Sequence, residues 1–210
     1  MLVYFRSMYS IKKTDQTNDS IIRQALVKQL ENEYASNPEY RVIPELGLWH
    51  GASRIDVAVV NGILHGFEIK SDRDTLYRLP SQREAYNSVF DKVTLVVGAK
   101  HFIDAFKIVP DWWGIQTAHL DEDGVVFFNT IREPEENPKQ DEISIARLLW
   151  KNEALELLEI VGKADGVRSK PREFIYTRVA ETIEINVLKK YVRNVLQGPR
   201  QDWRPDLQLA

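Results

Sequence analysis

A glutamate and a lysine stand two positions apart in the apolar stretch "GFEIKSD", residues 66–72. Alternate residues of a β-strand project from the same side, so Glu68 and Lys70 would share one face of a strand. Asp56 lies in the preceding apolar run, "RIDVAVV". Neighbouring carboxylates repel each other unless a cation lies between them, and Mg²⁺ prefers oxygen ligands. These three residue types predict a Mg²⁺ site with a lysine beside it.

Such a site has the chemistry needed to hydrolyse a phosphodiester. A bound divalent ion activates water and neutralises the charge that develops on the phosphate. A lysine beside the ion stabilises the transition state or helps to position the attacking water. A Glu-x-Lys tripeptide alone is a weak signal, because it arises by chance in many charged chains. The competing interpretation is a surface ion pair on the solvent-facing side of an edge strand.

The turn between the two apolar runs decides whether Asp56 can reach Glu68. Asn61 and Gly62 separate the runs and predict a tight β-hairpin. A two-residue loop would put Asp56 on the opposite face from Glu68. A three-residue loop, with Gly62 in the left-handed conformation, would place Asp56 diagonal to Glu68 and within reach of a shared ion.

The apolar pattern favours the three-residue loop. In this register Val59 pairs with Ile63, Asp56 faces Gly66, and Arg54 faces Glu68. The apolar side chains of both strands then share one buried face: Ile55, Val57, Val59, Ile63, Phe67 and Ile69. Because the core and the carboxylates demand the same register, we favour the metal site over the surface ion pair.

The composition restricts the class of protein. The 210 residues are 43% hydrophobic and 28% charged, as in a folded globular protein. There are no cysteines, which excludes disulfides and thiolate zinc sites, and the four histidines lie far apart in the sequence. Nothing resembles a signal peptide, and no apolar run approaches membrane-spanning length. We therefore expect a cytoplasmic protein with no membrane contact.

The surrounding elements predict an α/β core over residues 1–131. Residues 18–34 show helical spacing behind the N-cap candidates Asn18, Asp19 and Ser20. An extended segment over residues 40–49 precedes the hairpin, and a helix follows it from Ser81, with Glu84 completing a capping box. A buried strand at 92–98, a short helix at 101–108 and a strand pair across residues 121–124 follow. This order predicts a mixed central sheet flanked by helices.

A C-terminal helical extension is predicted over residues 142–197, followed by a polar tail, 198–210. The polar segment after Ile131 is a linker, and two long helices follow it, at 143–162 and 172–197. The net charge is −3, yet ten Lys/Arg stand against five Asp/Glu between Lys163 and Arg204. This imbalance permits nucleic-acid contact, although solvated helix faces give the same count. The helices also offer a surface for a homodimer or a partner protein.

At Asp56 and Glu68-Ile69-Lys70 the sequence resembles the PD-(D/E)XK nuclease superfamily, in which an Asp in one strand precedes Glu-x-Lys in the next. The proline of the name is absent, because Ile55 stands before Asp56. The stretch "QREAY" is similar to the Gln-x-x-x-Tyr motif of RecB-like nucleases. Most of residues 19–160 also resembles a family of small, uncharacterised bacterial proteins assigned to this superfamily.

The resemblance implies a restriction-endonuclease-like fold and roles for further residues. It implies that Gln82 and Tyr86 orient Lys70 or touch the nucleic-acid backbone. An early glutamate would complete the metal shell, and we favour Glu45 for this role over Glu31 and Glu33.

The expected function is a Mg²⁺-dependent nuclease, with Mn²⁺ as a substitute and DNA as the expected substrate. The expected catalytic residues are Asp56, Glu68, Lys70, Gln82 and Tyr86, the metal ligands are Glu45, Asp56 and Glu68, and the nucleic-acid contacts are Arg54, Arg73 and Arg78. One alternative is a nuclease fold that only binds nucleic acid or a partner. Another is a regulatory module whose C-terminal helices dock a partner.

Several neighbouring residues have a plainer interpretation. Asp74 is suited to cap the turn after the Glu-x-Lys stretch. Trp112 and Trp113 could stack on bases, but their position between Pro110 and Gly114 favours packing. His65 is expected to be a core histidine and not a catalytic one.

Overall fold

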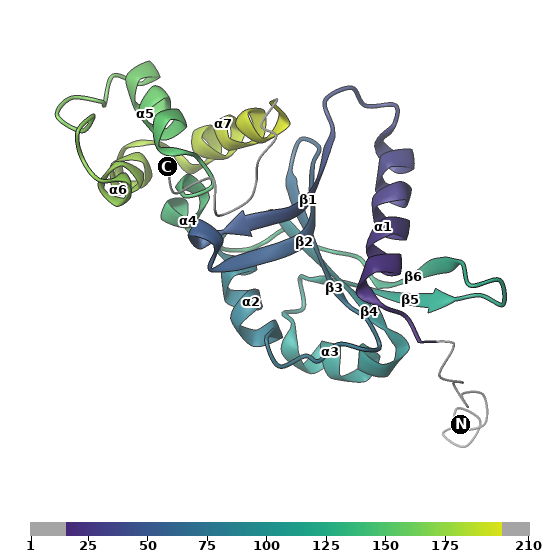
Figure 1. Ribbon diagram of the computed structural model, residues 1–210. Coiled ribbons are helices and arrows are strands. Elements are labelled where there is room, and N and C mark those ends of the chain that lie inside the picture. Colours follow the sequence, from purple (N-terminus) through teal and green to yellow (C-terminus); the bar gives the residue numbers. More distant parts are fainter. Residues whose placement is uncertain (1–15, 199–210) are drawn as a thin grey trace.

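The computed structural model describes residues 16–198, which form a six-stranded mixed sheet with helices on both faces (Figure 1). The strands lie in chain order across the sheet: β1 (Arg41–Leu48), β2 (Ser53–Val60), β3 (Leu64–Lys70), β4 (Lys92–Gly98), β5 (Gly114–Leu120) and β6 (Val126–Arg132). Strands β3, β4 and β5 run parallel, and the other neighbours pair antiparallel. The predicted α/β class is confirmed.

Two faces of the sheet carry different helices (Figure 1). Helix α1 (Asp19–Tyr34) lies on one face, and α2 (Leu79–Asn87) and α3 (Phe102–Ile108) lie on the other. Short 3₁₀ turns, η2 (Trp49–Gly51) and η3 (Ala99–His101), follow β1 and β4. The predicted start of α1 is confirmed, because the Asn18 side chain accepts a hydrogen bond from the Ile21 N–H.

The register of the β2–β3 hairpin differs from both predicted registers. Val60 pairs with Leu64, and Ala58, not Asp56, faces Gly66. The loop has three residues, 61–63. The φ of Gly62 is positive, 71°, so its left-handed conformation is as predicted. Relative to the favoured register, the pairing has moved by two residues. A two-residue shift keeps every side chain on its face, so the apolar pattern could not distinguish these registers.

The face assignment is therefore confirmed for most of the hairpin. Val57, Val59, Phe67 and Ile69 pack together under α1. Ile55 belongs instead to the core on the other face, and Ile63 lies in the loop, so both predictions were wrong. The predicted capping box of α2 was also wrong: the helix begins at Leu79, and the Ser81 hydroxyl donates to the carbonyl of Arg78.

The C-terminal extension contains four helices, where two long ones were predicted: α4 (Glu142–Ala146), α5 (Lys151–Ile160), α6 (Arg172–Thr182) and α7 (Ile185–Gln197). Polar side chains start new helices inside the amphipathic runs. The Glu153 carboxylate accepts the N–H of Trp150 at 2.6 Å, and the Glu184 carboxylate accepts the N–H of Asn186 at 2.9 Å. Helix periodicity alone does not show these internal caps.

The extension shares its apolar core with the sheet. One continuous buried cluster joins the α2 face of the sheet to α4, α5, α6 and α7. The predicted linker is also held in place, because Asn137 Nδ2 donates to the carbonyls of Asn87 and Phe90 at 2.7 and 2.8 Å. Within residues 16–198, no helix is long and apolar enough to cross a membrane. Apart from Gly198, the predicted polar tail lies outside the described residues.

Candidate active site

Asp56 lies where the β2–β3 ladder ends. The last backbone pair is Val57 with Phe67. Beyond it, Asp56 Oδ2 accepts the N–H of Ile69 at 2.7 Å, so a side-chain carboxylate takes the place of a main-chain acceptor. The carboxylate is thereby fixed between the two strands, at the end of the sheet where a cleft begins.

A polar cleft of about 400 Å³ opens at this end of β2 and β3. Its lining comes from both strands and from the segments around them: Asp19, Gly51, Ala52, Ser53, Arg54, Asp56, Glu68, Ile69, Lys70, Asp74, Arg78 and Gln82. Asp56, Glu68, Lys70 and Gln82 therefore meet here, as the sequence predicted. Tyr86 lies behind Glu68, whereas Glu45 and Arg73 do not line the cleft.

Glu68 is held by three neighbours and is only 1% exposed. Lys70 Nζ forms an ion pair with Oε1, and Gln82 Nε2 donates to the same oxygen at 2.8 Å. The Tyr86 hydroxyl lies 2.6 Å from Oε2. Gln82 and Tyr86 thus bind Glu68 directly and contact Lys70 only through it, whereas the resemblance implied that they orient Lys70 or touch the nucleic-acid backbone. Side chains locked in this way give a site a fixed geometry.

The Tyr86 hydroxyl also lies 2.6 Å from the carbonyl oxygen of Arg54. It therefore bridges β2 and β3 from the α2 side. Burial, reinforced by the charge of Glu68, raises the pKa of Tyr86 far above its ordinary value, so the hydroxyl keeps its proton. Gln82 has a less complete environment: its Oε1 is buried without a hydrogen-bond partner among residues 16–198.

Asp56 differs from Glu68 in its electrostatics. Burial, followed by repulsion from Glu68, raises the pKa of Asp56 to about 7, although Ile69, Arg23 and Lys70 act in the other direction. A divalent cation beside Asp56 would offset the desolvation of the carboxylate and reduce its repulsion from Glu68. Within residues 16–198, no group of three His, Cys, Asp or Glu side chains is arranged to hold a metal. Asp56 and Glu68 do line the same cleft, and carboxylate oxygens are the donors that Mg²⁺ prefers, commonly one or two of them together with waters.

Arg23 is the main site residue that the sequence analysis missed. Its guanidinium donates to Asp56 Oδ1 at 3.0 Å, to Asp19 Oδ2 at 2.9 Å and to Glu45 Oε1 at 2.8 Å. Burial lowers the pKa of Arg23, but the bond to Glu45 and the charges of Asp56 and Asp19 outweigh this effect and raise it overall. The spacing of Asp19 and Arg23, four positions apart on one helix, was the available signal.

Glu45 lies beside Asp56 on the neighbouring strand, at the rim of the site. The flanking pairs, Pro44 with Val57 and Leu46 with Ile55, place it abreast of Asp56, and its φ of 54° turns the strand there. Its carboxylate binds Arg23 and, at 3.3 Å, Arg54. The bond from Arg23 lowers the pKa of Glu45. The predicted ligand Glu45 therefore forms ion pairs with two arginines. Arg54 does not pair with Glu68 as predicted, because the β2–β3 ladder ends at Val57 and Phe67.

The other candidates divide between the rim and the core. Arg78 is exposed at the cleft, and Arg73 is exposed outside its lining. Asp74 caps the local turn as predicted, since its Oδ2 accepts the N–H and the hydroxyl of Ser71 at 2.8 and 2.6 Å. Trp113 is fully buried and donates to Asn87 Oδ1, which confirms packing for this tryptophan.

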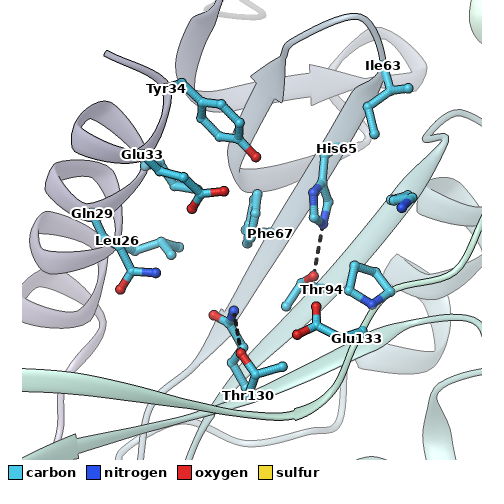
Figure 2. Close-up of a pocket in the computed structure, with 14 residues that line it drawn as sticks. Leu26, Gln29, Glu33, Tyr34, Ile63, His65, Phe67, Thr94, Thr130 and Glu133 are labelled. Atoms are coloured by element: carbon cyan, nitrogen blue, oxygen red, sulfur yellow. Dashed lines mark hydrogen bonds between the residues drawn. The ribbon is translucent and has the colours of Figure 1, made fainter. Parts of the chain in front are cut away.

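A second hollow, of about 470 Å³, lies at the far end of α1 (Figure 2). Glu33, the alternative ligand in the sequence analysis, lines this hollow, and Glu31 is exposed. His65 stacks on Phe67 with ring centroids 4.2 Å apart and contacts Thr94 Oγ1 at 2.9 Å. Burial, reinforced by Lys92, lowers the pKa of His65 to about 3, so the ring is neutral. His65 is therefore packed against Phe67, but it is half-buried at the wall of a hollow and not in the core, at the opposite end of β3 from Lys70.

These features define an α/β protein with a carboxylate-lined cleft at the end of a split strand pair. The chain belongs to the bacteriophage P4 protein cII family, whose sequence profile matches residues 12–203. One relative, Protein cII of Enterobacteria phage P4, is 39% identical over 74 residues, which are 35% of this chain and 28% of the relative. The matched part thus spans less than a third of that relative's length.

One solved structure is also similar to this chain. It is a protein of unknown function from Silicibacter pomeroyi, 16% identical, with a TM-score of 0.40 over 70% of this chain and 96% of that chain. Neither name states an activity, so the function has to be argued from the cleft itself.

Proposed function

We propose that this protein is a metal-dependent nuclease that hydrolyses phosphodiester bonds, with DNA as its substrate, and that it acts in the cytoplasm. The observation that supports this most is the pair of carboxylates in the cleft. Glu68 is buried and held by Lys70, Gln82 and Tyr86, while Asp56 stands beside it with a pKa raised to about 7. Arrangements that perturb an acidic group this strongly in a cleft are typical of functional sites.

In this proposal, Asp56 and Glu68 hold Mg²⁺ or Mn²⁺, and Gln82 and Tyr86 keep Glu68 in place. The bound ion would supply Lewis acidity and lower the pKa of a bound water. Lys70 lies on the cleft wall with its side chain 11% exposed, where it can stabilise negative charge that develops on a phosphate. Arg54 and Arg78, at the rim, are suited to bind the phosphates on either side.

The decisive experiment is cleavage of linear, nicked, branched and single-stranded DNA with Mg²⁺ or Mn²⁺, with an EDTA control. Glu68→Gln should reduce cleavage by roughly a hundredfold or more, because it removes a charge that the ion needs. The control is Lys107→Gln, which removes an exposed ion pair with Asp104. Cleavage that survives both Glu68→Gln and EDTA would refute the proposal.

A second candidate function is docking of a partner protein or a second copy by the C-terminal helices. The observation that favours it is a set of exposed apolar side chains there: Ile160 is 67% exposed, Val187 49% and Phe174 45%. A stable complex through these residues, with no cleavage of any substrate in Mg²⁺ or Mn²⁺, would favour docking over catalysis.

A further inference from the structure

We propose that Arg23 is an internal competitor of the metal ion. Its guanidinium holds Asp56 when no ion is bound, and a divalent cation must displace it to bind there. This inference rests on the proposed function, because it concerns the regulation of the same carboxylate site.

The two oxygens of Asp56 are already occupied by protein donors. Oδ2 accepts the Ile69 N–H at 2.7 Å, and Oδ1 accepts from Arg23 at 3.0 Å. The Ile69 bond belongs to the sheet and is fixed by the backbone. Oδ2 is held against the backbone of β3, so an ion that approaches Asp56 would meet the charge of Arg23 beside Oδ1. Two cations on one oxygen repel each other strongly in a partly buried site.

The guanidinium has other acceptors to which it can stay bound if its contact with Asp56 is lost. Arg23 is one side chain on the surface of α1, 25% exposed, and its Nε is buried without a hydrogen-bond partner among residues 16–198. Its other two acceptors, Asp19 and Glu45, are 40% and 47% exposed. Arg23 can therefore keep contact with these two exposed carboxylates when its bond to Asp56 breaks.

A purely structural role for the Arg23–Asp56 bond is the main alternative. However, α1 has two other attachments to the sheet. Thr17, just before the helix, donates through its N–H and its hydroxyl to buried Asp72, at 3.0 and 2.8 Å. The helix also buries an apolar face against the sheet: Ile22, Leu26 and Leu30. These attachments hold α1 without Arg23, so the bond between Arg23 and Asp56 can break without displacing the helix.

The test is direct binding of Mn²⁺ to the full-length protein, followed by the electron paramagnetic resonance of the free ion, without any substrate. Arg23→Gln should bind Mn²⁺ about tenfold more tightly or better, because one competing charge is removed. Arg23→Lys keeps the charge but cannot bridge three carboxylates, so its affinity should lie between the two. Lys107→Gln removes the same charge far from the cleft and should bind like the wild type.

The outcomes separate this inference from the proposed function. Unchanged or weaker Mn²⁺ binding by Arg23→Gln, with a wild-type circular dichroism spectrum, overturns the role of Arg23 alone. If neither protein binds Mn²⁺ at millimolar concentrations, the carboxylates hold no ion and the proposed function is wrong as well. Should Arg23→Gln fail to fold, Arg23→Lys decides, because an affinity equal to that of the wild type would then overturn the inference.

Discussion

Asp56 and Glu68 line the same cleft, yet they differ in burial, in hydrogen bonding and in how readily their charge changes. Glu68 is almost fully buried and receives hydrogen bonds or charge from three side chains. Asp56 retains some exposure and is poised near the midpoint of its titration at neutral pH. The Glu68 carboxylate is therefore fixed in position, whereas the charge of Asp56 changes with pH and with the charges around it.

Asp56→Asn should change the pH dependence of stability. The folded pKa of Asp56, about 7, lies above the ordinary value near 4, so the unfolded state gives up its proton first. This residue therefore costs stability progressively from about pH 4 to pH 7, and the full cost persists above pH 7. Asparagine avoids the cost and keeps an oxygen for the Ile69 N–H. We expect urea denaturation to show a relative gain of about 1–3 kcal/mol between pH 4 and pH 8.

A pH-independent difference between Asp56→Asn and the wild type would contradict the raised pKa of Asp56. The loss of the Arg23 ion pair acts in the opposite direction, so the sign of the change between the two pH values is more informative than the absolute value at either one.

Lys70→Ala should strongly reduce cleavage while leaving DNA affinity nearly intact. The Lys70 side chain is mostly buried against Glu68 and offers little surface to bound DNA. Its expected contribution is to the transition state, so turnover should fall by roughly a hundredfold or more and the Kd by less than about threefold. Fluorescence anisotropy in Ca²⁺ and single-turnover cleavage in Mg²⁺ measure the two effects separately. A large loss of affinity with unchanged turnover would show that Lys70 is a binding residue.

At the scale of the elements, the start of α1 depends on the close approach of β4 to Asp72. Gly98 leaves no room for a side chain: a Cβ would lie 2.4 Å from Asp72 Oδ1 and 2.7 Å from the Asp72 backbone nitrogen. The Asp72 carboxylate in turn binds Thr17 and the N–H of Lys100. One small residue in β4 therefore permits the network that positions α1, and with it Asp19 and Arg23.

Gly98→Ala should destabilise the protein by about 2–4 kcal/mol, because the clash involves backbone that cannot move freely. Gly124→Ala is the matched control: it meets open space and carries only the strain of a positive φ, 78°, which costs about 1 kcal/mol. Chemical denaturation of both variants tests the difference. Equal stabilities would mean that Asp72 can rearrange and does not fix α1.

The elements also show what could be predicted from the sequence. The alternating apolar residues correctly predicted which side of β2 and β3 faces the core. The same alternation fits two registers that differ by two residues, and the observed register is not the one that was favoured. The grouping of Asp56, Glu68, Lys70 and Gln82 was still predicted correctly, because the first three lie on the two strands of one hairpin and Gln82 lies on the helix that follows. Arg23 was not predictable in the same way, since its partners, Glu45 and Asp56, come from strands 22 and 33 positions away.

At the scale of the whole molecule, the extension supports one rim of the cleft. The turn η2, whose Gly51 lines the cleft, is bound by two helices of the extension. Trp49 Nε1 donates to Ser144 Oγ of α4 at 3.1 Å, and His50 Nε2 lies 2.6 Å from Glu173 Oε1 of α6. The predicted division into a core and an added extension therefore understates how closely the two parts depend on each other.

A fragment of residues 1–131 should not fold, because the buried cluster of the sheet continues into α4–α7. Truncation would expose β1 and α2 side chains and would leave Asp91, buried in the full chain, without the charge of Lys189. We expect the fragment to aggregate or to lack cooperative unfolding, whereas the full chain should unfold in one transition. A soluble 1–131 fragment with a sharp denaturation curve would contradict this dependence and restore the predicted boundary.

Four of the eight described basic residues that were counted from Lys163 onward have local partners. Lys189 and Arg193 face Asp91, and Arg168 binds Glu159 at 3.0 Å. Lys170 lies over the ring of Phe174, 5.6 Å from its centroid. Arg200 and Arg204 lie outside the described residues. About half of the described positive charge counted in the sequence is therefore balanced or covered within the fold, which weakens the charge imbalance as an argument for nucleic-acid contact by the extension.

Asp56 carries a proton for part of the time at neutral pH, and metal binding would release this proton into the buffer. An ion that binds this carboxylate expels whatever proton it carries, so metal uptake should acidify the medium by up to about one proton per protein near pH 6 and by almost none near pH 8. Calorimetric heats of Mn²⁺ binding should therefore differ between phosphate-free buffers of high and low ionisation enthalpy at pH 6, and the difference should vanish at pH 8. The heat released as the buffer takes up protons would then count the protons that this one aspartate gives up.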